Sequence, residues 1–322
     1  MRNMDAKSSS AFVALMAIAG CVADTSGVAD DALGGSGGYT YIKAQTPHAA
    51  DLFGSAVALS ADGLVMVIGA PAEDLSAGIE PEAGAVSVYV RASSTDAWKL
   101  ATELRPTYRE GFALYGSSVA LSADGSTLVV GAKGDSIPDT QPTVRPPSGT
   151  LEFSGAAYVY TRAGAQWNQR AYLRAEHAFR GDNFGEAVAV SADGSTVAVG
   201  APRESSSAHG VNGNYVYDPN KAGESGAAYV YSRSGASWGP QAYIKASNAD
   251  AGDWFGSALS LSGDGKTLAV GALMESSGAK GVQPADQASN SAAGSGALYV
   301  FTKAGATWSQ QAYIKASNAE KK

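Results

Sequence analysis

An acidic side chain recurs at one fixed place in the sequence, four residues after the glycine of a repeated Gly-Ala pair. The four acids are Glu73, Asp135, Glu204 and Glu275. If the four copies are arranged around one axis, these acids lie on one face and form an acidic ring for a cation or a basic partner. The alternative is structural, with each carboxylate capping its own loop or solvated at the surface.

A second set of candidate binding residues lies in the loop 212–220, which has the sequence NGNYVYDPN. Asn214, Tyr215 and Asp218 supply oxygen atoms and an aromatic ring, which suit a metal ion or a glycan. A well-packed turn is the alternative. Trp254 precedes Phe255 in the fourth copy only, and a tryptophan outside the repeated pattern suits stacking on a sugar or a partner. The other tryptophans occur once per copy and are assigned to packing: Trp98, Trp167, Trp238 and Trp308.

Composition restricts both the fold and the partners. The net charge is -7 and no basic stripe is present, which argues against a nucleic-acid partner. The chain has 39 glycines but only 12 prolines, and 16% of its residues are charged, which favours many short strands joined by tight turns. No apolar stretch reaches the roughly 18 residues of a membrane-spanning helix.

The one cysteine, Cys21, follows a weakly basic start and an apolar run over 11–20. A run of this length is typical of a signal peptide. The sequence IAGC that ends at Cys21 resembles the lipobox of bacterial lipoproteins, which implies cleavage before Cys21 and its acylation. We therefore expect a signal peptide over 1–20, a flexible Gly/Ser-rich tether over 21–38, and a lipid anchor in the bacterial envelope, at the outer membrane or cell surface. A plain secretory signal with an incidental cysteine is the alternative.

Four copies of one unit occupy residues 39–322, at about 45–106, 107–175, 176–246 and 247–316. In every copy an aromatic-Gly pair is followed after nine residues by Asp-Gly, and after seven more by Gly-Ala. Asp-Gly between two apolar runs predicts a tight hairpin because glycine accepts a positive φ. A tyrosine-rich strand and a last strand after the tryptophan complete four strands per unit. Strands that are apolar on both faces must be covered on both, as in the stacked sheets of a β-propeller.

The recurring sequences, such as FGEAVAVSADGSTVAVGAP and SGAAYVYSRSGASW, resemble FG-GAP repeats, which build the seven-bladed propeller of integrin α chains, and more closely their bacterial tandem form. The resemblance implies an all-β propeller of four four-stranded blades, and by analogy adhesion or the binding of a protein or glycan. The family's Asp-x-Asp-x-Asp-Gly calcium loop is reduced here to its final Asp-Gly. Because calcium takes about six to eight oxygen ligands, we expect no calcium and no other cofactor.

The sequence leaves closure of the ring open. Residues 39–44 and 312–316 both contain Tyr-Ile-Lys-Ala and compete for one closing strand. Either one segment is surplus or the chain does not close by itself, and an unpaired edge strand would favour self-association. The loops after the Gly-Ala pairs are the expected binding surface, because insertions in repeat proteins map to one face. They span 72–82, 134–153, 203–224 and 274–294.

No catalytic motif is present. The three histidines occupy unrelated places in the repeat, and the chain contains no Gly-x-Ser-x-Gly, P-loop or His-Glu-x-x-His sequence. We therefore predict a surface binding or adhesion module that is not an enzyme. A passive envelope or assembly protein is one alternative, and a polysaccharide hydrolase or lyase with carboxylates from different copies is another.

Overall fold

The computed structural model describes residues 41–74, 81–106, 111–136 and 152–319. The chain divides into two compact units, Met1–Tyr41 and Ile42–Lys322, and every strand of the described residues belongs to the second. The predicted signal peptide, Cys21 and the predicted tether fall outside the described residues. Within the described part, the second unit is all-β except for one short helix.

Four antiparallel sheets make up the described part of the second unit, and we call them blades 1 to 4 in chain order. Three of them have four consecutive strands, and the fourth has a fifth, short strand at its outer edge. Blade 1 contains β1 (Ala56–Leu59), β2 (Val65–Ala70), β3 (Ala85–Val90) and β4 (Lys99–Leu104). Blade 2 contains β5 (Tyr115–Leu121), β6 (Thr127–Ala132), β7 (Ala156–Ala163) and β8 (Gln166–Leu173). Blade 3 contains β9 (Ala187–Val190), β10 (Thr196–Ala201), β11 (Ala227–Ser234) and β12 (Ser237–Ile244), with α1 (Pro219–Ala222) between β10 and β11. Blade 4 contains β13 (Phe255–Leu261), β14 (Thr267–Ala272), β16 (Ala297–Ala304) and β17 (Thr307–Lys315), and β15 (Gly281–Val282) pairs with its outer edge.

A Ser-x-Asp-Gly turn joins the first two strands of every blade. In blade 1 the Ser60 hydroxyl donates to Asp62 Oδ1 at 2.5 Å, and the same oxygen accepts from the Leu64 amide at 2.9 Å. Gly63 has a φ of 67°, which glycine adopts without steric cost. The hydrogen bond from the serine is the main cause of a lowered pKa at each turn aspartate: Asp62, Asp124, Asp193 and Asp264. The predicted hairpins are confirmed, and their aspartates hold the turns.

Glycines let neighbouring blades approach at the level of the backbone. A Cβ added to Gly69 would overlap the carbonyl oxygen of Gly116 in the next blade. Tyr115, the aromatic residue before Gly116, is fully buried, and its backbone bridges to Gly84 of blade 1. The same close approach joins Gly131 to Gly185 and Gly200 to Gly256. The aromatic-Gly and Gly-Ala motifs therefore serve packing between blades.

The two central blades are covered on both faces. Every residue of β6 and of β10 is buried. Three clusters of buried apolar side chains form the core, one at each junction between consecutive blades. Aromatic rings pack edge to face within a blade, as between Tyr115 and Tyr158, whose centroids are 5.2 Å apart. The prediction that strands apolar on both faces are sandwiched is confirmed.

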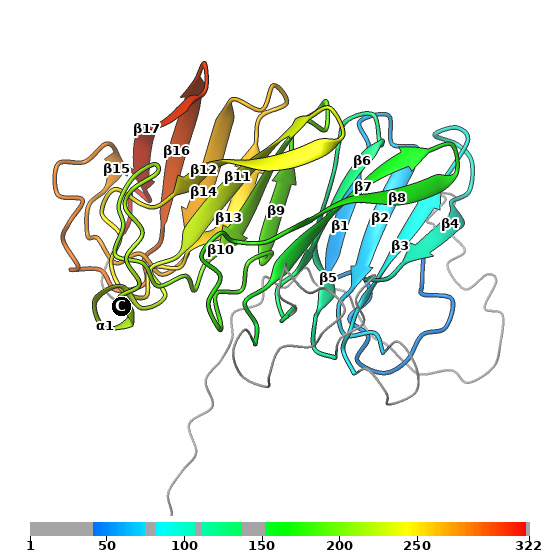
Figure 1. The fold of residues 1–322 in the computed structure, drawn as a ribbon, viewed down its shortest axis with the longest axis horizontal. Coiled ribbons are helices and arrows are strands. Elements are labelled where there is room, and N and C mark those ends of the chain that lie inside the picture. The colour runs from blue at the N-terminus through cyan, green and yellow to red at the C-terminus, as the bar shows by residue number, and fades with distance from the viewer. Residues whose placement is uncertain (1–40, 75–80, 107–110, 137–151, 320–322) are drawn as a thin grey trace, which may run out of the picture. The chain divides into compact units, whose positions relative to one another are not determined.

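The blades follow one another in a row, from blue β1 to red β17 (Figure 1). Extensive contacts join blade 1 to blade 2, blade 2 to blade 3, and blade 3 to blade 4. No comparable contact joins blade 1 to blade 4 in the part of the chain that the structure describes. The fold is a four-bladed, propeller-like arrangement in which closure of the ring is not detected.

Neither segment expected to provide a closing strand does so. Residues 312–315 lie in β17, which pairs with β16 as the outer strand of blade 4. Residues 42–44 form no strand, and 39–40 fall outside the described residues. Each blade takes its outer strand from its own unit. Self-association through a surplus edge strand therefore stays a prediction.

Candidate functional site

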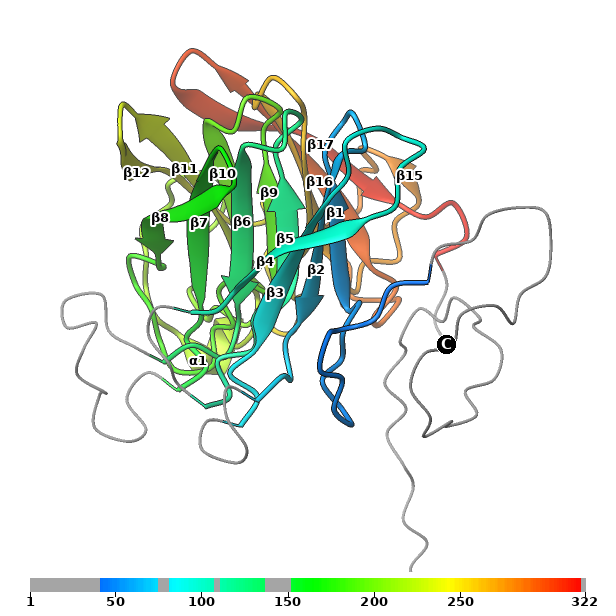
Figure 2. The same cartoon turned by 90° about the vertical axis from the view of Figure 1, so that its right-hand side faces the viewer.

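The loops that follow the Gly-Ala pairs gather at one end of the blades. Because the strands alternate in direction, the Asp-Gly turns lie at the opposite end. Figure 2 shows α1 and the long loops of the described chain at the bottom of the view, below the strands. The four repeated acids and the loop 212–220 belong to this end.

The four repeated acids are buried at the base of these loops. Glu73 is 5% exposed, and the other three are no more than 1% exposed. Each acid lies beside a cation at, or directly after, the end of the outer strand of its own blade. The pairs are Glu73 with Arg105, Asp135 with Arg174, Glu204 with Lys245, and Glu275 with Lys315. The expectation of an exposed acidic ring is therefore corrected, because burial removes each carboxylate from solvent and its own blade neutralises it.

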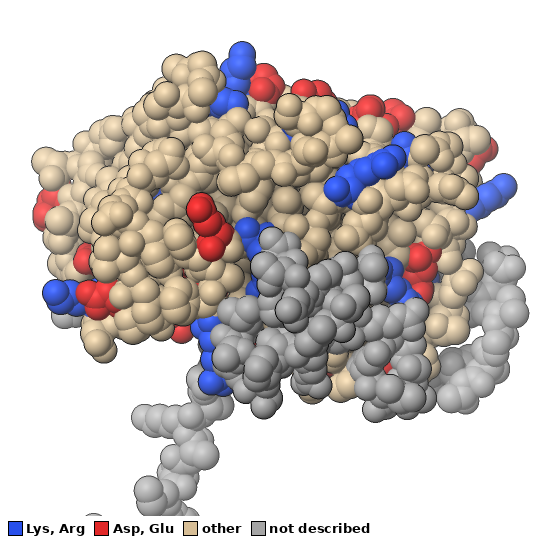
Figure 3. Space-filling view, viewed as in Figure 1, with Lys and Arg blue, Asp and Glu red and all other residues tan. Residues whose placement is uncertain are grey.

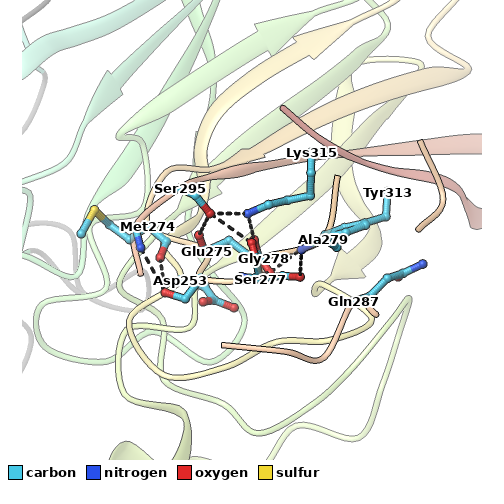
Figure 4. Close-up of polar contacts among 12 residues, drawn as sticks. Asp253, Met274, Glu275, Ser277, Gly278, Ala279, Gln287, Ser295, Tyr313 and Lys315 are labelled. Atoms are coloured by element: carbon cyan, nitrogen blue, oxygen red, sulfur yellow. Dashed lines mark hydrogen bonds and ion pairs between the residues drawn. The ribbon is translucent and has the colours of Figure 1, made fainter. Parts of the chain in front are cut away.

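Blade 4 shows such an acid–base cluster in detail (Figure 4). Lys315 Nζ donates to Glu275 Oε2 at 2.5 Å and to Ser295 Oγ at 2.7 Å. Glu275 Oε1 accepts from the Tyr313 hydroxyl at 2.9 Å and from the Ser277 amide at 3.1 Å. The Glu275 carboxylate thus ties the loop after β14 to the outer strand β17, and Lys315 connects both to Ser295, which lies two residues before β16. These contacts support the structural alternative, in which each acid caps its own loop.

The equivalent cluster in blade 3 shows the effect of burial on charge. Burial lowers the pKa of Lys245, and Glu204, at 2.6 Å, opposes that shift. Asp182 interacts electrostatically with both groups, and burial raises its pKa to about 8. Burial raises the pKa of its counterpart in blade 4, Asp253, to about 7. Asp182 is therefore protonated at neutral pH, so the cluster holds fewer buried charges than its residue types suggest.

A groove of about 920 Å³ opens between blades 2 and 3, beside the cluster of blade 3. This volume is within the roughly 300–1,000 Å³ of small-molecule sites. Blade 2 contributes the end of β8 and the connection that follows it. Blade 3 contributes β11, β12 and residues 212–215 of the loop after β10. The side chains that define the groove include Tyr172, His177, Asn214, Tyr215, Tyr229 and Trp238.

Aromatic rings dominate the walls of this groove. Tyr215 stacks on His177, with ring centroids 4.1 Å apart and an interplanar angle of 26°. The ring of Tyr243 lies 6.2 Å from that of Tyr215 and 5.3 Å from that of Tyr229. Such rings combine an apolar face with a polar tip, which suits a ligand that has both kinds of surface.

Three buried polar atoms of residues that line the groove have no hydrogen-bond partner among the residues that the structure describes. They are the hydroxyls of Tyr215 and Tyr229 and the Nε1 of Trp238. Burial, with a smaller contribution from Glu204, raises the pKa of both tyrosines, so both hydroxyls stay protonated and can donate as well as accept. An unpaired buried polar group costs about 1–3 kcal/mol. The residues that line the groove therefore carry three polar atoms for which the described part of the chain supplies no partner.

The residues predicted in the loop 212–220 divide between the groove and the framework. Asn214 and Tyr215 line the groove. Asp218 instead caps α1, where its Oδ1 accepts a hydrogen bond from the Lys221 amide at 3.1 Å. The loop thus contains both a packed turn and a part that faces the groove.

Trp254 lies away from the groove. Its φ is 56°, and its indole Nε1 donates to Glu224 Oε2 at 2.9 Å. The guanidinium of Arg203 lies 5.5 Å from the centroid of its ring. These contacts hold Trp254 against its own chain.

Sequence reasoning missed His177, Tyr229 and Trp238. The tyrosine and the tryptophan stand at repeated positions, which predict packing, and the histidine has no counterpart among the other two histidines. One signal in the sequence distinguishes the junction between blades 2 and 3 from the junction between blades 3 and 4. His177 lies in the connection between blades 2 and 3, at the position where the connection between blades 3 and 4 has Asn248. This difference indicates a site only when the structure shows that His177 lines the groove between the two blades.

Other binding features are limited in the described part of the chain. No three His, Cys, Asp or Glu side chains there come together as metal ligands. No helix there has the length and hydrophobicity to cross a membrane. On the face shown in Figure 3, basic side chains are scattered among acidic ones and form no continuous stripe.

Four consecutive four-stranded antiparallel sheets, packed face to face, define a propeller-type repeat protein. The profile of the FG-GAP repeat family matches residues 41–89, 167–231 and 238–301, which is more than half of the chain. The chain belongs to the FG-GAP repeat family. The second and third matches run from the outer strand of one blade through the third strand of the next, so the family unit is offset from the blade. No curated protein matches the chain.

Proposed function

We propose that this protein is a non-catalytic binding module of the bacterial cell envelope, and that the groove between blades 2 and 3 holds a glycan. One observation carries the proposal: the groove combines stacked aromatic rings with three unpaired polar atoms. A sugar ring presents C–H faces that pack on aromatic rings and hydroxyls that both donate and accept hydrogen bonds.

Each groove residue has a defined part in this proposal. The Tyr215–His177 stack receives the sugar ring. The hydroxyl of Tyr229 pairs with a sugar hydroxyl, and Trp238 Nε1, which is a donor only, pairs with a sugar oxygen. The buried pair of Glu204 and Lys245 beside the groove is neutral as a whole, so it requires no charge on the ligand.

Binding of a saccharide panel, followed by quenching of tryptophan fluorescence, tests the groove. We expect Tyr215→Ala to weaken binding about tenfold or more, since it removes both the stacking ring and a hydroxyl. Tyr229→Phe removes one hydroxyl and should weaken binding about two- to tenfold. Tyr299→Phe is the matched control, because Tyr299 occupies the same place in blade 4. Equal effects of Tyr229→Phe and Tyr299→Phe, or binding of peptides alone, would refute the glycan site.

Absence of catalysis is a separate part of the proposal. The bound saccharide should keep its mass after prolonged incubation with the protein, as measured by mass spectrometry. Release of shorter or unsaturated products would replace this function with that of a polysaccharide hydrolase or lyase.

Attachment to the membrane through Cys21 completes the proposal. The IAGC sequence supports acylation of Cys21, and the Gly/Ser-rich residues 21–38 would separate the binding unit from the bilayer. We expect Cys21→Ser to move the protein from the membrane fraction to the soluble fraction and to remove the lipid mass from the N-terminal peptide. An unchanged fractionation would argue against the anchor.

A further inference from the structure

The outer face of blade 4 exposes side chains that are buried in the other blades. β6 and β10 are buried throughout, whereas their counterpart β14 is buried only at every second residue. Leu298 in β16 is 38% exposed, although the residues at the same position in blades 1 to 3 are fully buried. Those residues are Val86, Ala157 and Ala228. Blade 4 therefore presents the surface on which another blade packs elsewhere in the chain.

The opposite end of the row has the complementary exposed face. Val57 and Leu59 in β1 are 64% and 57% exposed. Their counterparts in blade 2, Val119 and Leu121, are partly buried and pack in the core cluster between blades 1 and 2. Blade 1 therefore presents the surface that blades 2 to 4 use to pack on the blade before them.

The glycine contacts are incomplete at the same two faces. Gly54 in blade 1 has no atom within 4 Å of an added Cβ, whereas its counterparts in blades 2 to 4 would clash with the preceding blade. Gly271 in blade 4 lies near only its own strand pair, through Ala258, whereas its counterparts touch the glycine of the following blade. One half of the backbone contact is thus exposed at each end.

Backbone hydrogen bonds connect the Asp-Gly turns of consecutive blades. The amide of Ala61 donates to Ala123 O at 2.8 Å, that of Ala123 to Ala192 O at 3.0 Å, and that of Ala192 to Gly263 O at 2.9 Å. Among the described residues, the amide of Gly263 donates to no neighbouring blade, and the carbonyl of Ala61 accepts from none. The row therefore ends in an available donor on blade 4 and an available acceptor on blade 1.

We propose that a second copy of this chain docks head to tail, with its blade 1 on blade 4 of the first copy. The docked pair repeats an interface that the chain already makes three times, with the same apolar strands, glycine contact and turn-to-turn hydrogen bond. Such a contact joins two different surfaces, so repetition gives a closed ring or a longer row. This inference rests on the fold and is independent of the glycan site.

Sedimentation of the full-length chain carrying Cys21→Ser, so that no lipid drives association, tests the proposal. We expect dimers or longer assemblies whose mass rises with concentration up to about 100 μM. Leu59→Arg blocks the blade 1 face and Leu298→Arg blocks the blade 4 face, and each variant alone should be monomeric. Both residues are exposed, so circular dichroism should show an unchanged fold. Val216→Arg, at an exposed loop residue, is the control and should assemble like the parent chain.

Mixing the two blocked variants gives the sharpest result. Each retains the face that the other lacks, so a head-to-tail contact predicts a 1:1 complex that grows no further. A parent chain that stays monomeric, or a mixture that stays monomeric, would overturn the proposal. So would variants that still assemble alone.

The backbone hydrogen bond proposed between two copies can be tested by removing its donor, the amide N–H of Gly263. Gly263 occupies the second position of its turn, where proline is accepted. Gly263→Pro removes the available amide and should weaken association about two- to tenfold. Gly263→Ala keeps the amide and places there the residue found in blades 1 to 3, so it should match the parent chain. Equal association of both variants would show that this hydrogen bond does not contribute to the interface.

Discussion

At the junction between blades 3 and 4, Tyr299 donates its hydroxyl to Asn248 Oδ1 at 2.7 Å. At the junction between blades 2 and 3, the equivalent residue is Tyr229, whose hydroxyl has no partner in the described part of the chain. His177 stands in place of Asn248 and stacks on Tyr215 instead. A change in one connecting residue thus turns a paired contact into an open one.

The tryptophans of the two junctions differ in the same way. Trp308 Nε1 donates to Gln241 Oε1 at 2.9 Å. The residue equivalent to Gln241 in blade 2 is Arg170, whose Nε donates to Thr161 Oγ1 at 2.8 Å. Because arginine has no acceptor atom, it offers nothing to Trp238. The groove therefore arises where two positions depart from the repeat, on a framework that the repeat itself supplies.

The largest expected effect concerns the framework that both junctions share. Lys245→Ala and Lys315→Ala each leave a buried carboxylate without its cation, at a cost of about 3–5 kcal/mol in the free energy of unfolding. Urea denaturation measures this cost. A loss below about 1 kcal/mol in either variant would show that the acid–base cluster is not structural in that blade.

Removing the partner of Tyr299 should convert the paired junction toward the open one. Asn248→Ala leaves the Tyr299 hydroxyl unpaired, and we expect a loss of about 1–3 kcal/mol in the free energy of unfolding. The control is Asn214→Ala, at an exposed residue beside the open groove, which should change stability little. Similar losses in both variants would break the distinction between the two junctions.

The reverse exchange should close the groove. Together, His177→Asn and Arg170→Gln give Tyr229 and Trp238 the partners that their counterparts have in blade 4. Two new hydrogen bonds should raise the free energy of unfolding by about 1–2 kcal/mol and abolish saccharide binding. Retained binding in a stabilised variant would place the ligand elsewhere.

The last expected effect accumulates gradually with pH. Folded Asp182 keeps its proton up to a pKa of about 8, whereas the unfolded carboxyl loses it near pH 4. The folded state therefore binds more protons between these values, and stability falls as pH rises through them. We expect the advantage of Asp182→Asn over the parent chain to grow by about 1 kcal/mol for each pH unit between pH 5 and pH 8, measured by urea denaturation.

The counterpart in blade 4 sharpens this test. Because the pKa of Asp253 is about 7, the advantage of Asp253→Asn should stop growing about one pH unit lower. Blade 2 has Ala113 at this position, so the fold accepts an uncharged residue there. A difference between variant and parent that does not change with pH would show that neither carboxyl is held protonated.

The sequence predicts those features whose cause is local. The Ser-x-Asp-Gly turns form from four adjacent residues, so the hairpin that contains Asp62 follows from the sequence. The acid–base clusters do not, because Lys315 lies 40 residues from Glu275 and only the register of β17 brings them together. The segment containing Lys315 instead suggests a closing strand when it is seen only as a surplus copy of Tyr-Ile-Lys-Ala.

The groove escapes prediction for a related reason. Its walls come from two blades, and a repeat alignment compares residues at the same position rather than residues that face each other. His177 and Tyr215 belong to different loops, yet their rings stack. Tyr229 occupies a position that blades 2 to 4 fill with tyrosine, and it differs from Tyr299 in that its hydroxyl has no hydrogen-bond partner in the described part of the chain.

The turn-to-turn hydrogen bonds from Ala61 to Gly263 have a consequence for how such chains change over generations. They use main-chain atoms alone, which every amino acid except proline possesses. Recombination within the gene can add or delete a whole unit while this hydrogen bond forms again at the new boundary, whatever side chains the turn residues carry apart from proline. Descendants can therefore vary in length by entire blades while each crevice between blades acquires its own specificity.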